Sequence, residues 1–216
     1  MSAKLFIGAV AASLMIAGSA NATVKNLVND GTFTGAGDPG GYATYYAVKP
    51  MGGWTVYHGS VDLVHKYWST PPGGGYSVDL DGNSPGWLGQ QVDFTHAGKY
   101  SISFYLSANP DGGQTPKSVE VSIGDQTQDF TITPGVGHNL TWTKEYFQFN
   151  EAPGGGPTIS DTLLFRSLDK NTPYGIVLAD VVVGAPEPAT WAMMLVGFGG
   201  LGAVLRMNRR RTLATA

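Results

Sequence analysis

The middle of the chain alternates apolar and polar residues with a period of two. In residues 100–107, the apolar side chains of Tyr100, Ile102, Phe104 and Leu106 alternate with polar ones almost without exception. Because successive side chains of a β-strand point to opposite faces, this pattern predicts a strand with one buried face. Alternation or short apolar runs predict further strands at residues 26–28, 54–57, 60–64, 76–80, 87–94, 119–123, 130–132, 147–149, 161–165 and 176–183.

Turn-forming residues separate these segments. Gly, Pro, Asn and Asp gather at residues 73–75, 81–83, 111–113 and 153–157, and no helical period of useful length interrupts them. About ten short strands at this spacing predict an all-β fold, an antiparallel jelly-roll β-sandwich. We expect one such domain over residues 23–185, since alternating strands resume within a few residues of each glycine stretch.

The N-terminal segment has the features of a secretory signal peptide. Lys4 precedes an apolar run over residues 5–17, and small residues stand at Ala20 and Ala22, the two positions that a signal peptidase reads. We therefore expect residues 1–22 to be removed after Ala22 and the rest of the chain to be exported.

The C-terminal segment, residues 186–216, has the features of a temporary membrane anchor. Residues 191–205 carry no charge, and a helix of this length spans about 22 Å against about 30 Å of hydrocarbon. Trp191 is placed at the interface, and an arginine cluster at 206 and 209–211 favours the cytoplasmic side. The sequence therefore predicts a domain held outside by a marginal membrane helix.

Charge and cysteine content exclude several functions. Residues 23–185 contain eight lysines and arginines against fifteen acids, a net charge of about −7. An acidic domain with dispersed lysines lacks the basic surface that nucleic acid requires, and it repels anionic lipid and polysaccharide unless calcium mediates. The chain has no cysteine, which excludes disulfides, thiolate chemistry and cysteine-bound zinc.

Aromatic and acidic residues in the first half are candidates for sugar binding. Tyr67 and Trp68 precede a Pro- and Gly-rich stretch and are expected at an exposed loop tip, where rings can stack on sugars. Asp79 and Asp81 lie two residues apart on a predicted strand, which places both on one face. Trp54 and Trp87 are either further binding residues or core residues.

A catalytic role has less support. Two close carboxylates could serve glycoside hydrolysis, but aspartates at strand ends more often accept backbone N–H bonds of turns. Residues 82–86 match the Gly-x-Ser-x-Gly pattern of a nucleophile elbow, yet Pro85 has no N–H to donate to an oxyanion. We therefore expect a turn between two strands there, and no catalytic residues.

The tail resembles a known sorting signal. Pro186, Glu187, Pro188, Trp191 and Ala192, followed by the apolar Gly-rich stretch and by Arg209, Arg210 and Arg211, are similar to the PEP-CTERM sorting signal of Gram-negative bacteria. That resemblance implies recognition by a membrane-bound sorting enzyme, an exosortase. It also implies cleavage near Glu187 and delivery to the cell surface or to an extracellular polysaccharide matrix.

The domain itself resembles the choice-of-anchor C family. The resemblance rests on residues 26–33, 53–56, 59–63, 76–86 and 179–183, of which the segment Ser-Val-Asp-Leu-Asp-Gly-Asn at 77–83 is the most specific. The family is similar to plant cell-wall proteins with galactose-binding-like jelly rolls. This implies a secreted carbohydrate-binding-like module and brings no catalytic residues.

Related sandwich modules hold a structural calcium between the loop after the first strand and an acid on the last strand. Asn29, Asp30 and Asp180 match that arrangement here, and oxygen ligands suit the ion. Thr34 and Ala179 depart from it, because many relatives of this wider fold have acidic residues at those positions.

Three functions remain open at this stage. The first is a non-catalytic surface protein that binds extracellular polysaccharide, and it is favoured here. The second is a structural or adhesive matrix protein without a sugar site. The third is a carbohydrate-active enzyme on the same scaffold, since fold does not fix function.

Overall fold

The structure is a computed structural model that describes residues 25–135, 139–152, 158–170, 172–184, 198–200 and 206. Val24–Pro188 forms one compact unit. Within the described residues no helix is long and apolar enough to cross a membrane. The signal peptide and nearly all of the membrane segment predicted from the sequence lie outside the described residues.

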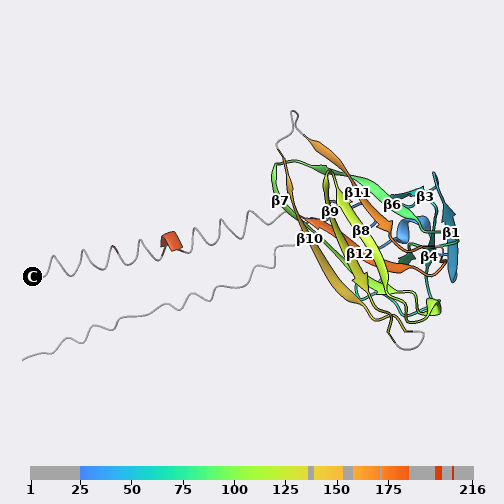
Figure 1. Cartoon of the computed structure of the whole chain (residues 1–216). Helices are drawn as coiled ribbons and strands as arrows, with labels where there is room; N and C mark the ends of the chain where they lie inside the picture. Colours follow the sequence, from blue (N-terminus) through green and yellow to red (C-terminus); the bar gives the residue numbers. More distant parts are fainter. Residues whose placement is uncertain are drawn as a thin grey trace, which may run out of the picture. The chain divides into compact units, whose positions relative to one another are not determined.

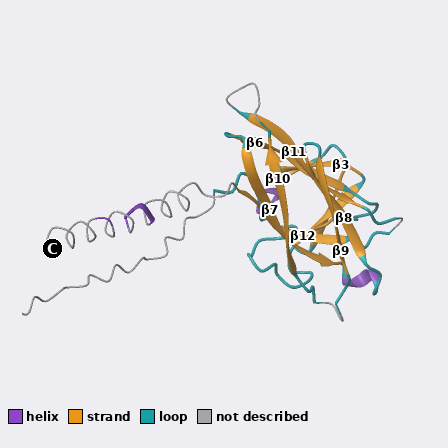
Figure 2. Ribbon diagram, turned by 60° about the vertical axis from the view of Figure 1, so that its left-hand side comes forward, coloured by secondary structure: helices purple, strands orange, loops and turns teal. Residues whose placement is uncertain are grey.

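The unit Val24–Pro188 is a two-sheet antiparallel β-sandwich, as the alternation predicted (Figures 1 and 2). One sheet has the order β1-β4-β5-β12-β7-β10, and the other has the order β2-β3-β6-β11-β8-β9. The strands are β1 Tyr42–Tyr46, β2 Pro50–Met51, β3 Trp54–His58, β4 Ser60–Val64, β5 Ser77–Asp79, β6 Trp87–Phe94, β7 Gly98–Ala108, β8 Lys117–Ile123, β9 Gln126–Ile132, β10 Thr143–Glu151, β11 Ile159–Ser167 and β12 Ile176–Gly184. Two short 3₁₀ helices, η1 Thr34–Ala36 and η2 Pro110–Gly112, complete the described elements of this unit.

The chain passes between the sheets in its second half, which gives the jelly-roll connection. Strand β6 lies in one sheet and β7 in the other. Strands β8 and β9 then return to the sheet of β6, and β10, β11 and β12 alternate between the two sheets. Central strands β7 and β12 pair with each other in one sheet, while β11 lies between β6 and β8 in the other.

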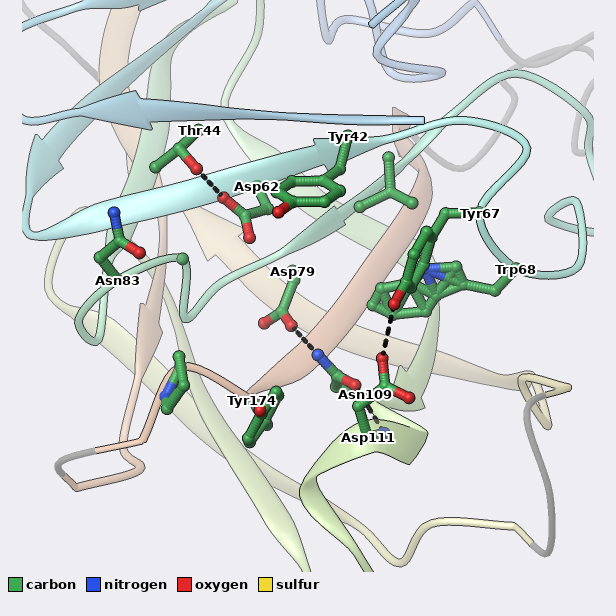
Figure 3. A pocket seen from close by; sticks show the side chains of 13 residues that line it. Tyr42, Thr44, Asp62, Tyr67, Trp68, Asp79, Asn83, Asn109, Asp111 and Tyr174 are labelled. Carbon is green, nitrogen blue, oxygen red and sulfur yellow. Dashed lines mark hydrogen bonds between the residues drawn. The ribbon is translucent and has the colours of Figure 1, made fainter. Parts of the chain in front are cut away.

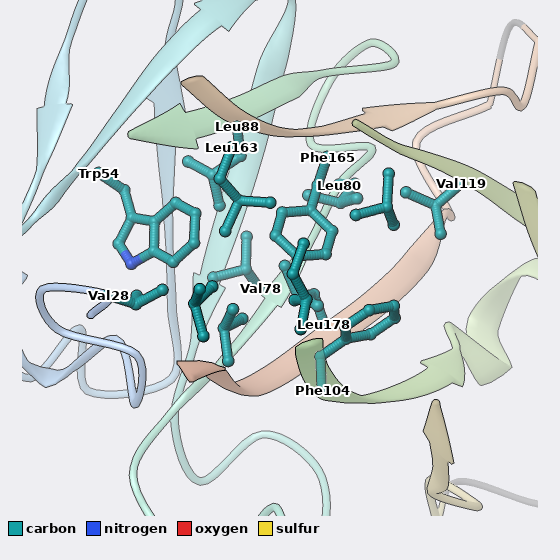
Figure 4. Packing of buried hydrophobic residues seen from close by; sticks show 14 of the residues in the cluster. Val28, Trp54, Val78, Leu80, Leu88, Phe104, Val119, Leu163, Phe165 and Leu178 are labelled. Carbon is teal, nitrogen blue, oxygen red and sulfur yellow. The ribbon is translucent and has the colours of Figure 1, made fainter. Parts of the chain in front are cut away.

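The core between the sheets is built from the predicted apolar positions. In β7, Tyr100 is 5% exposed, and Ile102, Phe104 and Leu106 are 0% exposed, which confirms the predicted buried face. Figure 4 shows Phe104, Phe165 and Trp54 among aliphatic residues of both sheets. Since every described core residue belongs to Val24–Pro188, this unit carries its own hydrophobic core.

Three local features differ from or refine the prediction. Residues 26–28 form no strand, although the Leu27 N–H donates to the Val183 carbonyl at 2.9 Å alongside β12. Strands β1 and β2 were not predicted, because the sequence of β1 lacks alternation and β2 has only two residues, one of them proline. Residues 82–86 form a turn between β5 and β6 with no helix after it, as expected.

Candidate functional site

A cleft of about 590 Å³ lies on the outer face of the sheet that begins with β1, β4 and β5 (Figure 3). Val61 and Leu63 of β4 are fully buried in the core, so Asp62 between them points to the opposite face. Loops around residues 67, 83, 110 and 174 surround that face. The cleft is lined by Tyr42, Thr44, Asp62, Val64, Tyr67, Trp68, Asp79, Gly82, Asn83, Asn109, Asp111, Pro173 and Tyr174.

Asp79, the last residue of β5, forms the floor of the cleft. Its side chain accepts hydrogen bonds from Asn109 Nδ2 at 2.6 Å, from the Asp81 N–H at 2.8 Å and from the Gly175 N–H at 3.0 Å. These donors favour the ionised carboxylate. Burial outweighs them and raises the pKa of Asp79 well above its usual value. The hydrogen bonds tie β5 to the loops before η2 and before β12.

Asp62 lies opposite Asp79 on the neighbouring strand β4. Thr44 Oγ1 on β1 donates to Asp62 Oδ1 at 2.6 Å, and Figure 3 shows the second carboxyl oxygen pointing into the cleft. Burial raises the pKa of Asp62, and the bond from Thr44 opposes this shift. One oxygen of Asp62 is therefore open to a ligand, whereas the neighbouring Asp79 is already held by hydrogen bonds within the domain.

Aromatic side chains form the walls. Tyr42 is 59% exposed, Tyr67 is 55% exposed and Tyr174 is 40% exposed. The Tyr67 ring meets the Tyr42 ring edge-on at 5.8 Å between centroids and the Trp68 ring edge-on at 5.6 Å. The Tyr67 hydroxyl donates to Asp111 Oδ2 at 3.3 Å, and this negative charge raises the pKa of Tyr67.

The structure brings together three of the four sugar-binding residues predicted from the sequence, namely Tyr67, Trp68 and Asp79. Asp81 does not line the cleft. Strand β5 ends at Asp79, and Asp81 forms an isolated bridge with Pro85 and is fully buried. Neither carboxyl oxygen of Asp81 has a hydrogen-bond partner of good geometry among the described residues. Burial raises its pKa to about 6, against the effects of the nearby Ser167 hydroxyl and of the charge of Lys117.

Sequence reasoning missed several lining residues, above all Tyr42, Asn109, Asp111 and Tyr174. Asn109 and Asp111 carry a local signal, since an Asn-Pro-Asp-Gly segment forms a capped turn in which the Asp111 N–H donates to Asn109 Oδ1 at 2.9 Å. Nothing in the sequence indicates that this turn meets the loop of Tyr174.

The residues predicted to bind calcium surround a second hollow only in part. Asp30 and Asp180 both line it, whereas Asn29 does not. Asp180 lies at a bulge of β12, accepts the Gly73 N–H on Oδ2 at 2.7 Å, and has no partner among the described residues for its buried Oδ1. Asp30 Oδ1 accepts the Gly35 N–H at 2.9 Å.

This hollow meets part of what calcium requires. Calcium takes six to eight oxygen ligands, roughly, and an unpartnered carboxylate oxygen is one such ligand. No group of three or more acidic, histidine or cysteine side chains suited to a metal occurs in the described part of the chain. The calcium site therefore stays a prediction that rests on Asp180 and Asp30.

Trp54 and Trp87 occupy different environments. Trp54 is 1% exposed, packs against Phe33 and Phe165, and donates from Nε1 to the Asp30 carbonyl at 2.9 Å. Trp87 is half-buried between His58 and Arg166 and does not line the cleft. Trp54 is thus a core residue, and Trp87 is a partly exposed packing residue.

The sorting and cleavage residues predicted from the sequence lie outside the described residues. These are Ala20, Ala22, Pro186, Glu187, Pro188, Trp191, Ala192, Arg209, Arg210 and Arg211.

One curated protein resembles the domain. Halomucin of Haloquadratum walsbyi (strain DSM 16790 / HBSQ001) is 32% identical over an alignment of 157 residues, and the match covers 70% of this chain. The chain spans only 2% of the length of halomucin.

Among solved structures, the chain is similar to a family 35 carbohydrate-binding module from Clostridium thermocellum. The TM-score is 0.46 at 14% identity, over 67% of this chain and 98% of that one. It is also similar to a CBM4 structure, with a TM-score of 0.43 at 16% identity over 73% of this chain and 98% of the other. At these scores neither structure bears on the function of this chain.

Two family models match the chain. The PEP-CTERM protein-sorting motif covers residues 185–211 and confirms the sorting signal expected from the sequence. The model of DUF642, described as a protein of unknown function, covers residues 26–181 and so includes every residue of the cleft. Since the DUF642 model matches well over half of the chain, the chain belongs to the DUF642 family, and it carries a PEP-CTERM sorting motif C-terminal to its DUF642 domain.

Proposed function

We propose that the domain binds carbohydrate in the tyrosine-lined cleft, without catalysis, and that the mature protein is displayed at the cell surface or in an extracellular polysaccharide matrix. The observation that carries the first part is the cleft itself. It combines exposed aromatic rings with carboxylate and amide groups whose positions are fixed by hydrogen bonds.

This combination suits a sugar. The C–H faces of a sugar ring pack on aromatic side chains, and its hydroxyls bond to a few well-placed polar groups. The volume of about 590 Å³ is in the range of small-molecule pockets. Asp62, Asn83 and Asn109 supply the polar groups around the three tyrosines.

The hydrogen bonds support binding rather than catalysis. Both oxygens of Asp79 accept N–H groups from Asn109 or the backbone, so this side chain is held in place by the fold. Asp62 retains one oxygen toward the cleft and has Thr44 on the other. Hydrolysis of a glycosidic bond calls for two carboxyl groups that both reach the substrate.

The sorting motif supports export and processing. We expect a signal peptidase to remove residues 1–22 and an exosortase-type enzyme to recognise residues 185–211 in a Gram-negative host. The membrane then holds the chain only transiently, before the domain is delivered to the surface. Matrix polysaccharide there is the expected ligand.

A glycan-array measurement on residues 24–188 tests the proposal, because this unit carries its own core. If Tyr67 or Trp68 packs on the sugar, Tyr67→Ala or Trp68→Ala should weaken binding by about 1 to 3 kcal/mol, as for other planar ligands on aromatic side chains. Tyr146→Ala is the matched control, since Tyr146 is 57% exposed on β10 and outside the cleft.

Two outcomes would count against this function. Unchanged binding after both Tyr67→Ala and Trp68→Ala would exclude the cleft as the sugar site. A domain that binds no glycan at all, including polysaccharide from its own host, would favour the structural or adhesive matrix role instead.

A further inference from the structure

The charged residues that line the cleft are all acidic. Of the thirteen described residues that line it, three are acidic and none is a lysine, arginine or histidine. Asp62 and Asp79 lie side by side on the floor, and Asp111 lies at the rim beside Tyr67. The potential in a partly buried cleft is set mainly by the charges that line it, because water screens them poorly there.

The aromatic rings form a corner rather than a flat surface. The Tyr67 ring is inclined at 75° to the Tyr42 ring and at 74° to the Trp68 ring. A sugar that stacks flat needs one open ring face. Rings set nearly at right angles instead can turn electron-rich faces toward a small volume from more than one direction. Tyr174 adds a third exposed phenol on the opposite side, as Figure 3 shows.

Aromatic walls around carboxylates are the arrangement that binds organic cations. The negative faces of tyrosine and tryptophan rings attract an ammonium group, and a nearby carboxylate adds a direct charge interaction. The second oxygen of Asp62 points into the cleft that these rings line (Figure 3). The half-buried Asp62 and the buried Asp79 lie opposite each other at an electrostatic cost that a bound cation would offset.

We propose that the cleft selects glycans with free amino groups, such as chains that contain glucosamine, and places the ammonium group between the tyrosine rings and the Asp62 carboxylate. The inference rests on the proposed function and names the class of sugar. A uronic acid or a sulfated sugar would instead bring its negative charge against the half-buried Asp62 and the buried Asp79. N-acetylation removes the cation and leaves the rest of the sugar unchanged.

Calorimetry with residues 24–188 tests this choice. The probes are glucosamine oligomers, N-acetylglucosamine oligomers of the same length, and oligogalacturonate, at low salt and near neutral pH, because burial raises the pKa of Asp62 and acid would remove its charge. We expect the glucosamine oligomer to bind at least about tenfold more tightly than the acetylated one, as cation–π contacts and a charge pair require. We expect no binding of oligogalacturonate. Added salt should reduce the difference between the first two probes.

Asp62→Asn is the decisive variant. Asparagine keeps an oxygen that can accept the Thr44 hydroxyl but removes the charge. It should abolish most of the preference for free amino groups, because it weakens binding of the glucosamine oligomer by a larger factor than binding of the acetylated oligomer, which has no ammonium group to lose its charge partner. Asp129→Asn removes one charge on the exposed side of β9, outside the cleft, and should leave the preference unchanged.

The outcomes separate this inference from the function beneath it. Equal or tighter binding of the acetylated oligomer, or of oligogalacturonate, overturns the amino-sugar preference and leaves carbohydrate binding intact. If Asp62→Asn and Asp129→Asn reduce the preference for free amino groups equally, the amino-sugar inference is also overturned, because the preference would then come from the net charge of the domain. Failure to bind any of the three probes or any glycan of the array overturns the proposed function itself.

Discussion

Asp62 and Asp79 are direct partners across the neighbouring strands β4 and β5, so two carboxylates share the floor of the cleft. Like charges opposite each other in a sheet destabilise it, and Asp79 is only 1% exposed. Burial raises the pKa of Asp79, and the charge of Asp62 adds to that shift. A sequence selected for stability alone would avoid this pair, which supports a binding role for the cleft.

The raised pKa values predict a domain that is more stable in mild acid. Burial raises the pKa of Asp81 from 3.8 to about 6. Such a group contributes stability that is fully present below its unfolded pKa and is lost as the pH rises through the folded pKa. We expect the free energy of unfolding in urea to be about 1 to 3 kcal/mol lower at about pH 7.5 than at about pH 4.5.

Asparagine variants identify the source of this pH dependence. Asp81→Asn should remove much of the slope and raise stability at the higher pH, because the neutral side chain no longer has to ionise in a buried site. Asp129→Asn, on the exposed side of β9, should leave the slope as it is. A wild-type domain that is equally stable at both pH values, or more stable at the higher one, would contradict the assignment.

The two tryptophans provide a second test, of packing. Trp54→Ala should lower the free energy of unfolding by about 3 to 5 kcal/mol, because a buried indole leaves a cavity beside Phe33 and Phe165. Trp87→Ala should cost roughly 1 kcal/mol, since that ring is half-buried and the surroundings can relax. Urea unfolding monitored by circular dichroism measures both. Equal losses would show that the two environments are alike.

Much of the fold could be predicted from the sequence because its strands are amphipathic. β7 and β8 alternate so regularly that face and register follow from the pattern, with Val119, Val121 and Ile123 buried as predicted. β1 could not be found in this way. Its sequence Tyr-Ala-Thr-Tyr-Tyr lacks a clear period, because an edge strand beside a cleft exposes aromatic residues that elsewhere would mark the core.

The cleft could be predicted only where its residues are close in sequence. Tyr67 with Trp68, and Asp79 at the end of a strand, carried local signals. Asn109 reaches Asp79 from 30 residues away and Gly175 from 96 residues away, and sequence patterns do not show which loops meet. Asp79 and Asp81 were expected on one face because the prediction had the strand continue through both. Strand β5 ends at Asp79, so the alternation of side chains no longer applies beyond that residue.

Calcium provides a third test. If an ion binds at Asp30 and Asp180, millimolar calcium should stabilise the domain by about 1 to 3 kcal/mol relative to chelator, since a ligand that prefers the folded state shifts unfolding by mass action. Asp180→Asn should remove this effect, whereas Asp62→Asn should not. A melting temperature that is the same in calcium and in chelator would exclude the site.

The sorting motif predicts that the mature protein lacks its tail. The apolar segment is short for a permanent anchor, and the arginines after it belong to the part expected to be removed near Glu187. Trypsin cleaves after Lys170 and next after Arg206, so an unprocessed chain yields one peptide that spans both Glu187 and Trp191. In surface protein from the native host, mass spectrometry should instead find a peptide that begins at Asn171 and ends near Glu187.

The control is the peptide after Arg166, which ends at Lys170; this peptide and others of the domain show that the protein was recovered. Recovery of the intact peptide through Arg206 from the mature surface protein would show that sorting leaves the tail in place.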